Sequence, residues 1–367
     1  MTRILVALLV GTMVVTSLVG CSSEEGSALV QDNQGASTED VLKVALLIPG
    51  TLGDESFYDA ANNGIQKVEE ELGAEIKVVE MGTDRTKWEP TVLDFSEQDW
   101  DIIISGSWGM TTIFNEVSEL YPDKKYINFD TTHPEVADNV YAMCYRTNEL
   151  AFLAGSLAAL QAQDEGQDTI GFIGGVDTPG INDFLVGYIE GAQYVNKDIK
   201  VAITYAGSFT DATKGKEVAL SMFNQDIDII FQVAGETGLG VIDAAKELDK
   251  YVIGVDSDQA LAIMDTDQEK AEHIITSAMK KIDESILRVV NQQVEGTLPY
   301  GTHQVLGLAE DGVGLAKNEI YQSLVSEENR VKIDEIEAKI INGEIQVATA
   351  FGMSSKEIAD LRDLVRP

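Results

Sequence analysis

The regular alternation of short apolar runs with amphipathic stretches after Val41 is the feature that most constrains the fold of this chain. Apolar side chains at helical spacing fill the intervals, for example in 56–72 and 147–162. Strands that alternate with helices of this length predict βαβ units and parallel sheets. The strand candidates are 41–49, 76–81, 101–106, 125–130, 139–145, 169–175, 200–207, 227–235, 251–256 and 273–279.

These strand candidates are apolar along almost their whole length, which is expected when helices cover both faces of a sheet. Ten or more strands suit two doubly wound sheets better than one, because strongly twisted open sheets rarely exceed about ten strands. No Pro-rich linker divides the chain, so we expect two α/β lobes joined by several crossings. Two charged helices, at about 326–342 and 355–364, are expected to close the chain.

The N-terminus is typical of a secretory signal. Arg3 precedes an apolar run from Ile4 to about Val15, which is too short to favour a membrane-spanning helix. Leu18-Val19-Gly20-Cys21 looks like a bacterial lipobox, in which cleavage precedes a cysteine that carries diacylglycerol. Two or more acyl chains make a stable membrane anchor. The alternative is an ordinary signal followed by an accidental cysteine.

The two cysteines have different expected roles. Lipidation of Cys21 would leave Cys144 without a partner, so we expect no internal disulfide and interpret Cys144 as a small core residue. The segment 22–40 is polar and aperiodic, which indicates a flexible tether.

The charge balance excludes one class of partner. The chain has 26 Lys+Arg against 62 Asp+Glu, a formal charge of −36. Removal of residues 1–20 takes away only Arg3 and makes the charge −37. Because nucleic-acid binding needs a basic patch that displaces counterions, we expect no nucleic-acid partner. Most of the acidity is interpreted as solvated surface.

No catalytic or cofactor motif stands out. The three histidines are scattered and lack zinc-site spacing, and no P-loop or nucleophile elbow is present. We therefore expect a protein that is not an enzyme, with no catalytic residues, no metal and no cofactor.

Polar and aromatic residues gather instead at the carboxyl ends of the expected strands, where doubly wound sheets bind ligands. Facing aromatic rings can stack a flat ring for about 1–3 kcal/mol per base, and carboxylates accept hydrogen bonds from hydroxyl groups. This combination favours a nucleoside, although a sugar also fits part of it. The strand ends carry Asp54, Phe57, Tyr58, Trp108, Asp130, Phe209, Asp211, Gly235, Asp256 and Lys280, from which the ligand-binding residues are expected to come.

Several candidates have a purely structural alternative. Phe57 and Phe209 also fit helix-start or core aromatics. Asp54 and Asp211 fit N-caps of the helices that follow them. Asp256 fits a turn cap, and Lys280 a surface charge.

Long ordered segments make the chain resemble the basic membrane protein family. This family comprises lipoproteins that are the substrate-binding components of ABC importers and includes purine nucleoside receptors. The resemblance covers nearly all of 42–316 and rests on 53–65, 169–195, 205–220, 228–247, 252–259, 275–283 and 307–316.

The resemblance implies a type I periplasmic-binding-protein fold, two doubly wound lobes that close on a ligand by hinge motion. Phe57 and Phe209 then resemble the ring-stacking pair. Asp54 and Asp130 look like hydrogen-bonding groups of the first lobe, and Trp108 like a further aromatic near the site. Gly235, Asp256 and Lys280 match positions that hold the ribose.

Two motifs depart from the family pattern. The common Ser-Phe-Asn is here Ser56-Phe57-Tyr58, which removes an amide that both donates and accepts. The common Ala-Gly-Gly-Thr-Gly has Glu236 at its third position, which adds a negative charge. Both changes bear on base preference and ligand class.

The expected division of the chain follows from these patterns. It is a signal peptide at 1–20, a lipidated Cys and tether at 21–41, lobe 1 at 42–145 plus about 275–305, lobe 2 at 146–274 plus about 306–345, and a C-terminal extension at 346–367.

The expected function is that of a lipid-anchored receptor on the extracytoplasmic face of the bacterial membrane. It captures a nucleoside, with purine favoured, and delivers it to an ABC permease and ATPase. The alternative is a receptor of the same fold for a sugar or signalling ligand, coupled to a membrane sensor. A nucleoside hydrolase is disfavoured, because such enzymes cluster carboxylates on a metal and Asp256 and Asp258 stand alone.

Overall fold

The computed structural model describes residues 41–367. The expected signal peptide, the tether and the lipidated Cys21 lie outside these described residues. Within 41–367 no helix is both long and apolar enough to cross a membrane.

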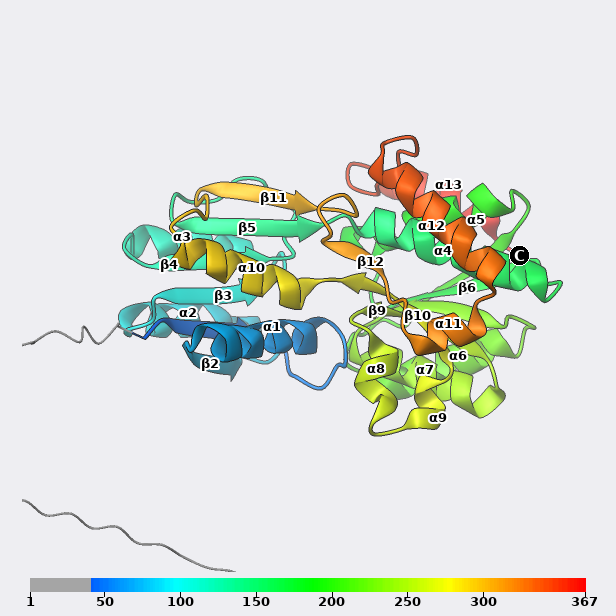
Figure 1. Cartoon of the computed structure of the whole chain (residues 1–367), viewed down its shortest axis with the longest axis horizontal. Coiled ribbons are helices and arrows are strands. Elements are labelled where there is room, and N and C mark those ends of the chain that lie inside the picture. Colours follow the sequence, from blue (N-terminus) through cyan, green and yellow to red (C-terminus); the bar gives the residue numbers. More distant parts are fainter. Residues whose placement is uncertain (1–40) are drawn as a thin grey trace, which may run out of the picture. The chain divides into compact units, whose positions relative to one another are not determined.

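The described chain forms two six-stranded sheets, each flanked by helices (Figure 1). The first sheet has the order β11-β5-β4-β3-β1-β2, and all its strand pairs are parallel. Its strands are β1 Lys43–Ile48, β2 Glu75–Glu80, β3 Ile102–Gly106, β4 Lys125–Phe129, β5 Val140–Tyr145 and β11 Thr302–Leu306. The helices of this first lobe are α1 Phe57–Leu72, α2 Trp88–Glu97, α3 Met110–Leu120 and α10 Ile282–Val294, with a 3-10 turn, η1, at Arg85–Lys87.

The second sheet has the order β12-β10-β9-β8-β6-β7, and only β12 runs antiparallel to its neighbour. Its strands are β6 Thr169–Gly174, β7 Lys200–Tyr205, β8 Ile229–Val233, β9 Tyr251–Asp256, β10 Ile274–Lys280 and β12 Val313–Leu315. The helices of this second lobe are α4 Thr147–Asp164, α5 Pro179–Val195, α6 Ala212–Phe223, α7 Glu236–Leu248, α8 Gln259–Met264, α9 Gln268–Ala271, α11 Glu319–Leu324, α12 Glu327–Ile341 and α13 Ser355–Val365.

The prediction of two doubly wound sheets is confirmed. Each of the expected strands is present, and central strands such as β3 and β8 are buried along their whole length, as their apolar composition indicated. Two strands were not expected, β11 and β12. The β11 sequence, THQVL, lacks the apolar run of the other strands, and β12 has only three residues, which is too few for a periodic pattern.

One expected lobe boundary differs in the structure. We expected lobe 1 to resume at about 275, but the strand from Ile274 to Lys280 pairs with β9 and β12 in the second sheet. The chain reaches the first lobe only with α10, which packs against α1. The apolar run of β10 is compatible with either sheet, so the sequence pattern does not specify its neighbours.

Each sheet uses the same spatial order of strands. Reading both orders from one edge, β4 and β9 occupy equivalent third positions. Asp130 directly follows β4, and Asp256 is the last residue of β9. Both have a left-handed backbone, with φ of 59° and 65°. The two lobes therefore present an aspartate in the same unusual conformation at the same place in the sheet.

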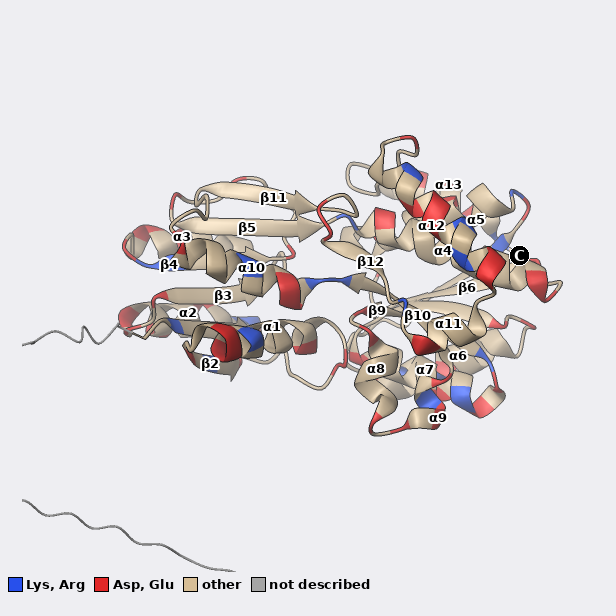
Figure 2. Cartoon of the chain, viewed as in Figure 1, with Lys and Arg blue, Asp and Glu red and all other residues tan. Residues whose placement is uncertain are grey.

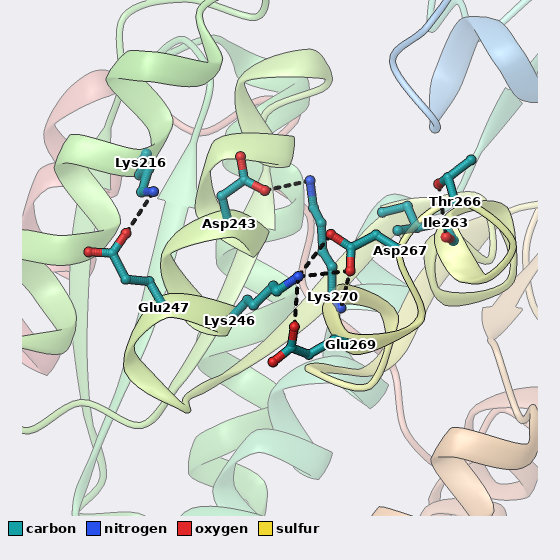
Figure 3. A network of polar contacts seen from close by, with 9 residues as sticks. All are labelled: Lys216, Asp243, Lys246, Glu247, Ile263, Thr266, Asp267, Glu269 and Lys270. Atoms are coloured by element: carbon teal, nitrogen blue, oxygen red, sulfur yellow. Dashed lines mark hydrogen bonds and ion pairs between the residues drawn. The ribbon is translucent and has the colours of Figure 1, made fainter.

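Acidic residues are spread over the helices and loops of both lobes, with basic residues among them (Figure 2). Three lysines of the second lobe pair with carboxylates on its surface (Figure 3). The network pairs Lys216 with Glu247 at 2.7 Å, Lys270 with Asp243 at 2.7 Å, and Lys246 with Asp267 at 2.8 Å and Glu269 at 3.0 Å. Exposed pairs of this kind contribute about 0–1 kcal/mol each. In these pairs, neighbouring carboxylates neutralise the charges of the three lysines.

Helices α4 and α5 pack with their backbones in close approach. A Cβ atom on Gly187 would come within 2.1 Å of the Asn148 carbonyl oxygen, and one on Gly191 within 2.0 Å of the Phe152 carbonyl oxygen. Glycine is therefore required at both positions. The approach fixes α5, whose first turns carry residues toward the carboxyl edge of the second sheet.

We expect Gly187→Ala to lower the free energy of unfolding by about 1–3 kcal/mol or more, because the added methyl group overpacks the interface between α4 and α5. Gly180→Ala is the matched control in the same helix, since no atom lies within 4 Å of its added Cβ. This control should be neutral or slightly stabilising. Urea denaturation of both variants tests the expectation, and equal stability would contradict it.

Candidate functional site

A buried lysine lies where the carboxyl edges of the two sheets meet. Lys280, the last residue of β10, is 6% exposed. Its Nζ lies 3.0 Å from Oδ2 of Asp130 and 3.7 Å from Oδ1 of Asp256. The three residues are called the central charge trio below. They come from both sheets, so the trio is a contact between the lobes.

The trio contains one ammonium and two carboxylates, and the ammonium lies closer to Asp130 than to Asp256. Burial lowers the pKa of Lys280, but the carboxylates of Asp130 and Asp256 outweigh it and raise that pKa overall. Lys280 is therefore a cation at neutral pH and pairs most closely with Asp130. Burial raises the pKa of Asp256 above its usual value. Oδ1 of Asp256 is buried and has no hydrogen-bond donor among the described residues.

Aromatic rings surround the ammonium group. The Phe57 ring centroid lies 5.1 Å from Lys280 Nζ, and the Phe184 centroid lies 5.2 Å from it. Phe57 begins α1 and packs on Phe129 and Tyr58. Both rings favour a nearby cation electrostatically. Phe184 was not among the expected site residues, because its apolar spacing in α5 is typical of a core position.

Hydrogen bonds between the lobes close the region beside the trio. Ser56 Oγ donates to the Val255 carbonyl oxygen at 3.0 Å and lies 3.3 Å from Asp256 Oδ2. Ser257 Oγ donates to the Glu55 carbonyl oxygen at 2.6 Å. The loop before α1 thus contacts the end of β9 directly.

Asp54 has a structural function in this geometry. Its carboxylate accepts hydrogen bonds from the backbone N–H groups of Ser56 at 3.0 Å, Tyr58 at 3.0 Å and Asp59 at 3.2 Å. These bonds satisfy donors at the start of α1, as a capping residue does. Burial nevertheless raises the pKa of Asp54 to about 6. A direct role of Asp54 in ligand binding stays a prediction.

Tyr58 also contacts its own loop. Its hydroxyl donates to the Pro49 carbonyl oxygen at 3.1 Å, and its ring lies against Gly50, where a Cβ would approach within 2.4 Å. Burial raises the pKa of Tyr58, with Asp54 and Asp130 acting in the same direction. The phenol is thus neutral and already has a hydrogen-bond acceptor.

Phe209 and Gly235 lie together in the second lobe. Phe209 is 39% exposed, and its ring covers Gly175, where a Cβ would come within 2.4 Å of the ring. The Phe209 carbonyl oxygen accepts from Thr237 N in the first turn of α7 at 3.1 Å. Gly235, at φ 57°, precedes that turn and leaves room beside the Phe209 carbonyl.

The remaining candidate, Trp108, has different surroundings. It is 64% exposed, and the guanidinium of Arg85 lies 4.8 Å from its ring centroid. The structure therefore brings Phe57, Asp130, Asp256 and Lys280 into one cluster and Phe209 and Gly235 into another. Among residues 41–367, no group of three or more metal-ligating side chains is arranged to hold an ion.

We expect the stability of the wild type relative to Asp54→Asn to fall as the pH rises from about 4 to about 6.5. Because the pKa of Asp54 is raised to about 6, the folded state retains a proton that an unfolded aspartate releases near pH 4. One pKa unit corresponds to about 1.4 kcal/mol, so the change is about 3 kcal/mol. The stabilisation is complete below the unfolded pKa and is lost as the pH passes the folded pKa.

Urea denaturation between pH 3 and 7.5 measures this difference. Asp84→Asn is the control, because Asp84 caps η1 and its pKa is lowered by hydrogen bonds from Thr86. The stabilisation that Asp84 contributes should be lost as the pH falls, which is the opposite pH dependence to that of Asp54. A pH-independent difference for Asp54→Asn would contradict the expectation.

Comparison with known proteins agrees with this architecture. Residues 41–350 match the family described as ABC transporter substrate-binding protein PnrA-like. The chain is 34% identical over 323 residues to basic membrane protein A of Borreliella burgdorferi, covering 86% of this chain and 90% of that protein. It is 32% identical to an uncharacterised lipoprotein of Pyrococcus horikoshii, covering 83% and 75%.

Solved structures agree with the fold. A solute-binding protein of an ABC transporter system from Aeropyrum pernix superposes with a TM-score of 0.76 at 26% identity, covering 88% of this chain and 97% of that one. Proteins of this family bind a substrate for a transporter rather than convert it. The chain therefore belongs to the family of PnrA-like ABC transporter substrate-binding proteins.

Proposed function

We propose that this protein is a lipid-anchored receptor that binds a nucleoside, with a purine base favoured, and delivers it to an ABC permease and its ATPase. Asp256 carries the proposal. Its Oδ1 is a buried acceptor without a hydrogen-bond donor among the described residues, 3.7 Å from the Lys280 ammonium. A buried acceptor of this kind costs about 1–3 kcal/mol unless a donor reaches it. A ribose hydroxyl supplies such a donor.

The surroundings of Asp256 support an uncharged ligand with a flat ring. Phe57 lies beside the trio, and the partly exposed Phe209 offers a ring on the second lobe. Two carboxylates face a single ammonium in the trio. This excess of negative charge disfavours the phosphate of a nucleotide, so a nucleoside fits better.

The membrane anchor is part of this proposal. It rests on the lipobox that ends at Cys21 and on the similarity to a Pyrococcus protein named as a lipoprotein. Anchoring through two or more acyl chains would keep the receptor at the extracytoplasmic face, beside the permease. Metabolic labelling with a radioactive fatty acid tests it. Label should enter the wild type but not Cys21→Ser, and equal labelling would overturn it.

A second candidate is a sugar or signalling ligand, with a membrane sensor as partner. Tyr58 favours it, because a phenol that already donates to Pro49 replaces the amide common in the family. Calorimetry on the purified protein separates the candidates. Adenosine, guanosine or inosine should bind more tightly than uridine, cytidine, ribose, galactose and AMP. Failure of every nucleoside to bind at millimolar concentration would overturn the proposal, and binding of a sugar alone would favour the second candidate.

We expect Asp256→Ala and Phe209→Ala to abolish nucleoside binding while the melting temperature of the ligand-free protein stays nearly unchanged. Burial of the Asp256 carboxylate costs free energy that offsets much of its attraction to Lys280. Its removal should therefore change the stability little, because Lys280 still pairs with Asp130. Phe209 is already partly exposed, so its truncation removes little packing.

Isothermal titration calorimetry measures nucleoside binding, and differential scanning calorimetry measures the melting temperature. Asp265→Ala is the matched control, because it removes an exposed carboxylate from the same lobe. A large loss of ligand-free stability in Asp256→Ala or Phe209→Ala, with affinity retained, would return these residues to structural roles.

A further inference from the structure

The C-terminal segment docks on the start of α5. The carboxylate of Asp183 is 1% exposed and accepts from Thr349 Oγ1 at 2.5 Å and Ala350 N at 2.9 Å. The same carboxylate accepts from Thr147 Oγ1 at 2.6 Å. A small apolar cluster of Val186, Ala350 and Ile358 then joins α13 to α5. The family match ends at residue 350, so α13 lies beyond it.

Arg362 on α13 holds two segments together. Its guanidinium forms two parallel hydrogen bonds with the Asp177 carboxylate, both at 2.9 Å. It also donates at 2.7 Å to Asn182 Oδ1 and at 2.7 Å to the Tyr205 hydroxyl, and lies 4.7 Å from the Tyr205 ring centroid. The guanidinium lowers the pKa of Asp177, so the pair is ionised at neutral pH. Asp177 belongs to the loop between β6 and α5, and Tyr205 ends β7.

The loop after β6 and the segment after β7 are hydrogen-bonded to each other beneath Phe209. Gly207 N donates to the Gly175 carbonyl oxygen at 2.7 Å, and Ala206 N donates to the Gly174 carbonyl oxygen at 2.9 Å. The Phe209 ring lies on Gly175. Arg362 therefore contacts both segments close to this ring. Its partner Asp177 lies two residues after Gly175, and its partner Tyr205 lies four residues before Phe209. Arg362 has no contact with Phe209 itself among the described interactions.

We propose that Arg362 is a positioning residue, through which the C-terminal helix α13 fixes the loop beneath Phe209 and thereby increases ligand affinity. The effect on affinity rests on the proposed role of Phe209 in nucleoside binding. The effect on the two segments does not, because it follows from contacts in the second lobe alone. A bidentate arginine is needed, since a lysine keeps the charge but provides only a point contact.

The first measurement is amide hydrogen exchange of the ligand-free full-length protein. In Arg362→Ala the amides of Gly175, Ala206 and Gly207 should exchange at least about fivefold faster than in the wild type, with a smaller increase in Arg362→Lys. Lys356→Ala is the control on the same helix, because within residues 41–367 its ion pair is with the exposed Asp360. It should leave these amides unchanged.

The second measurement is calorimetric affinity for the tightest-binding nucleoside. Arg362→Ala should weaken it by about fivefold or more, Arg362→Lys by less, and Lys356→Ala not at all. If no nucleoside binds the wild type, the proposed function fails while faster exchange in Arg362→Ala still supports the positioning role. Exchange in both Arg362 variants equal to that in Lys356→Ala, or raised uniformly over the second lobe, would overturn the inference. Unchanged affinity despite locally faster exchange would overturn its link to the ligand.

Discussion

A buried ammonium that pairs with a carboxylate of the opposite lobe is the interaction on which the arrangement of this protein depends. Lys280 lies at the end of β10, and its partners Asp130 and Asp256 end or follow equivalent strands of different sheets. An isolated buried charge is costly by several kcal/mol, so the ammonium requires a carboxylate close by. That requirement brings the carboxyl edges of the two sheets together, and those edges are where parallel sheets present their loops to a ligand.

Much of the fold was predictable because the chain repeats one simple pattern. Strands buried on both faces must be apolar throughout, so β3 and β8 are evident in the sequence. Periodicity is a local property, however, and sheet neighbours are not. Lys280 follows a run that fits either sheet, which is why the expected boundary at about 275 was wrong. The strand β12 is too short to produce a pattern at all.

The candidate site was predictable only in part, for a different reason. The rule that ligands bind beyond strand ends selected Asp130, Asp256 and Lys280, which the structure places together. The same rule selected Asp54, whose carboxylate caps α1, because caps and ligand groups occupy the same loops. Phe184 contacts Lys280 from a helix, and its spacing in the sequence matches that of any core residue. Whether a polar residue binds its own backbone or an external molecule depends on side-chain direction, which spacing does not record.

The two sheets protect their outer edges by different means. In β2, at one edge of the first sheet, Glu75, Lys77 and Glu80 place charges along the strand. The edge strand β7 of the second sheet carries only Lys200 as a charged residue, and α13 packs against it. Unpaired edges template the addition of further strands, and charges or a covering element prevent this. By packing against β7, the C-terminal helix restricts the approach of a further strand to this edge and so disfavours self-association through it.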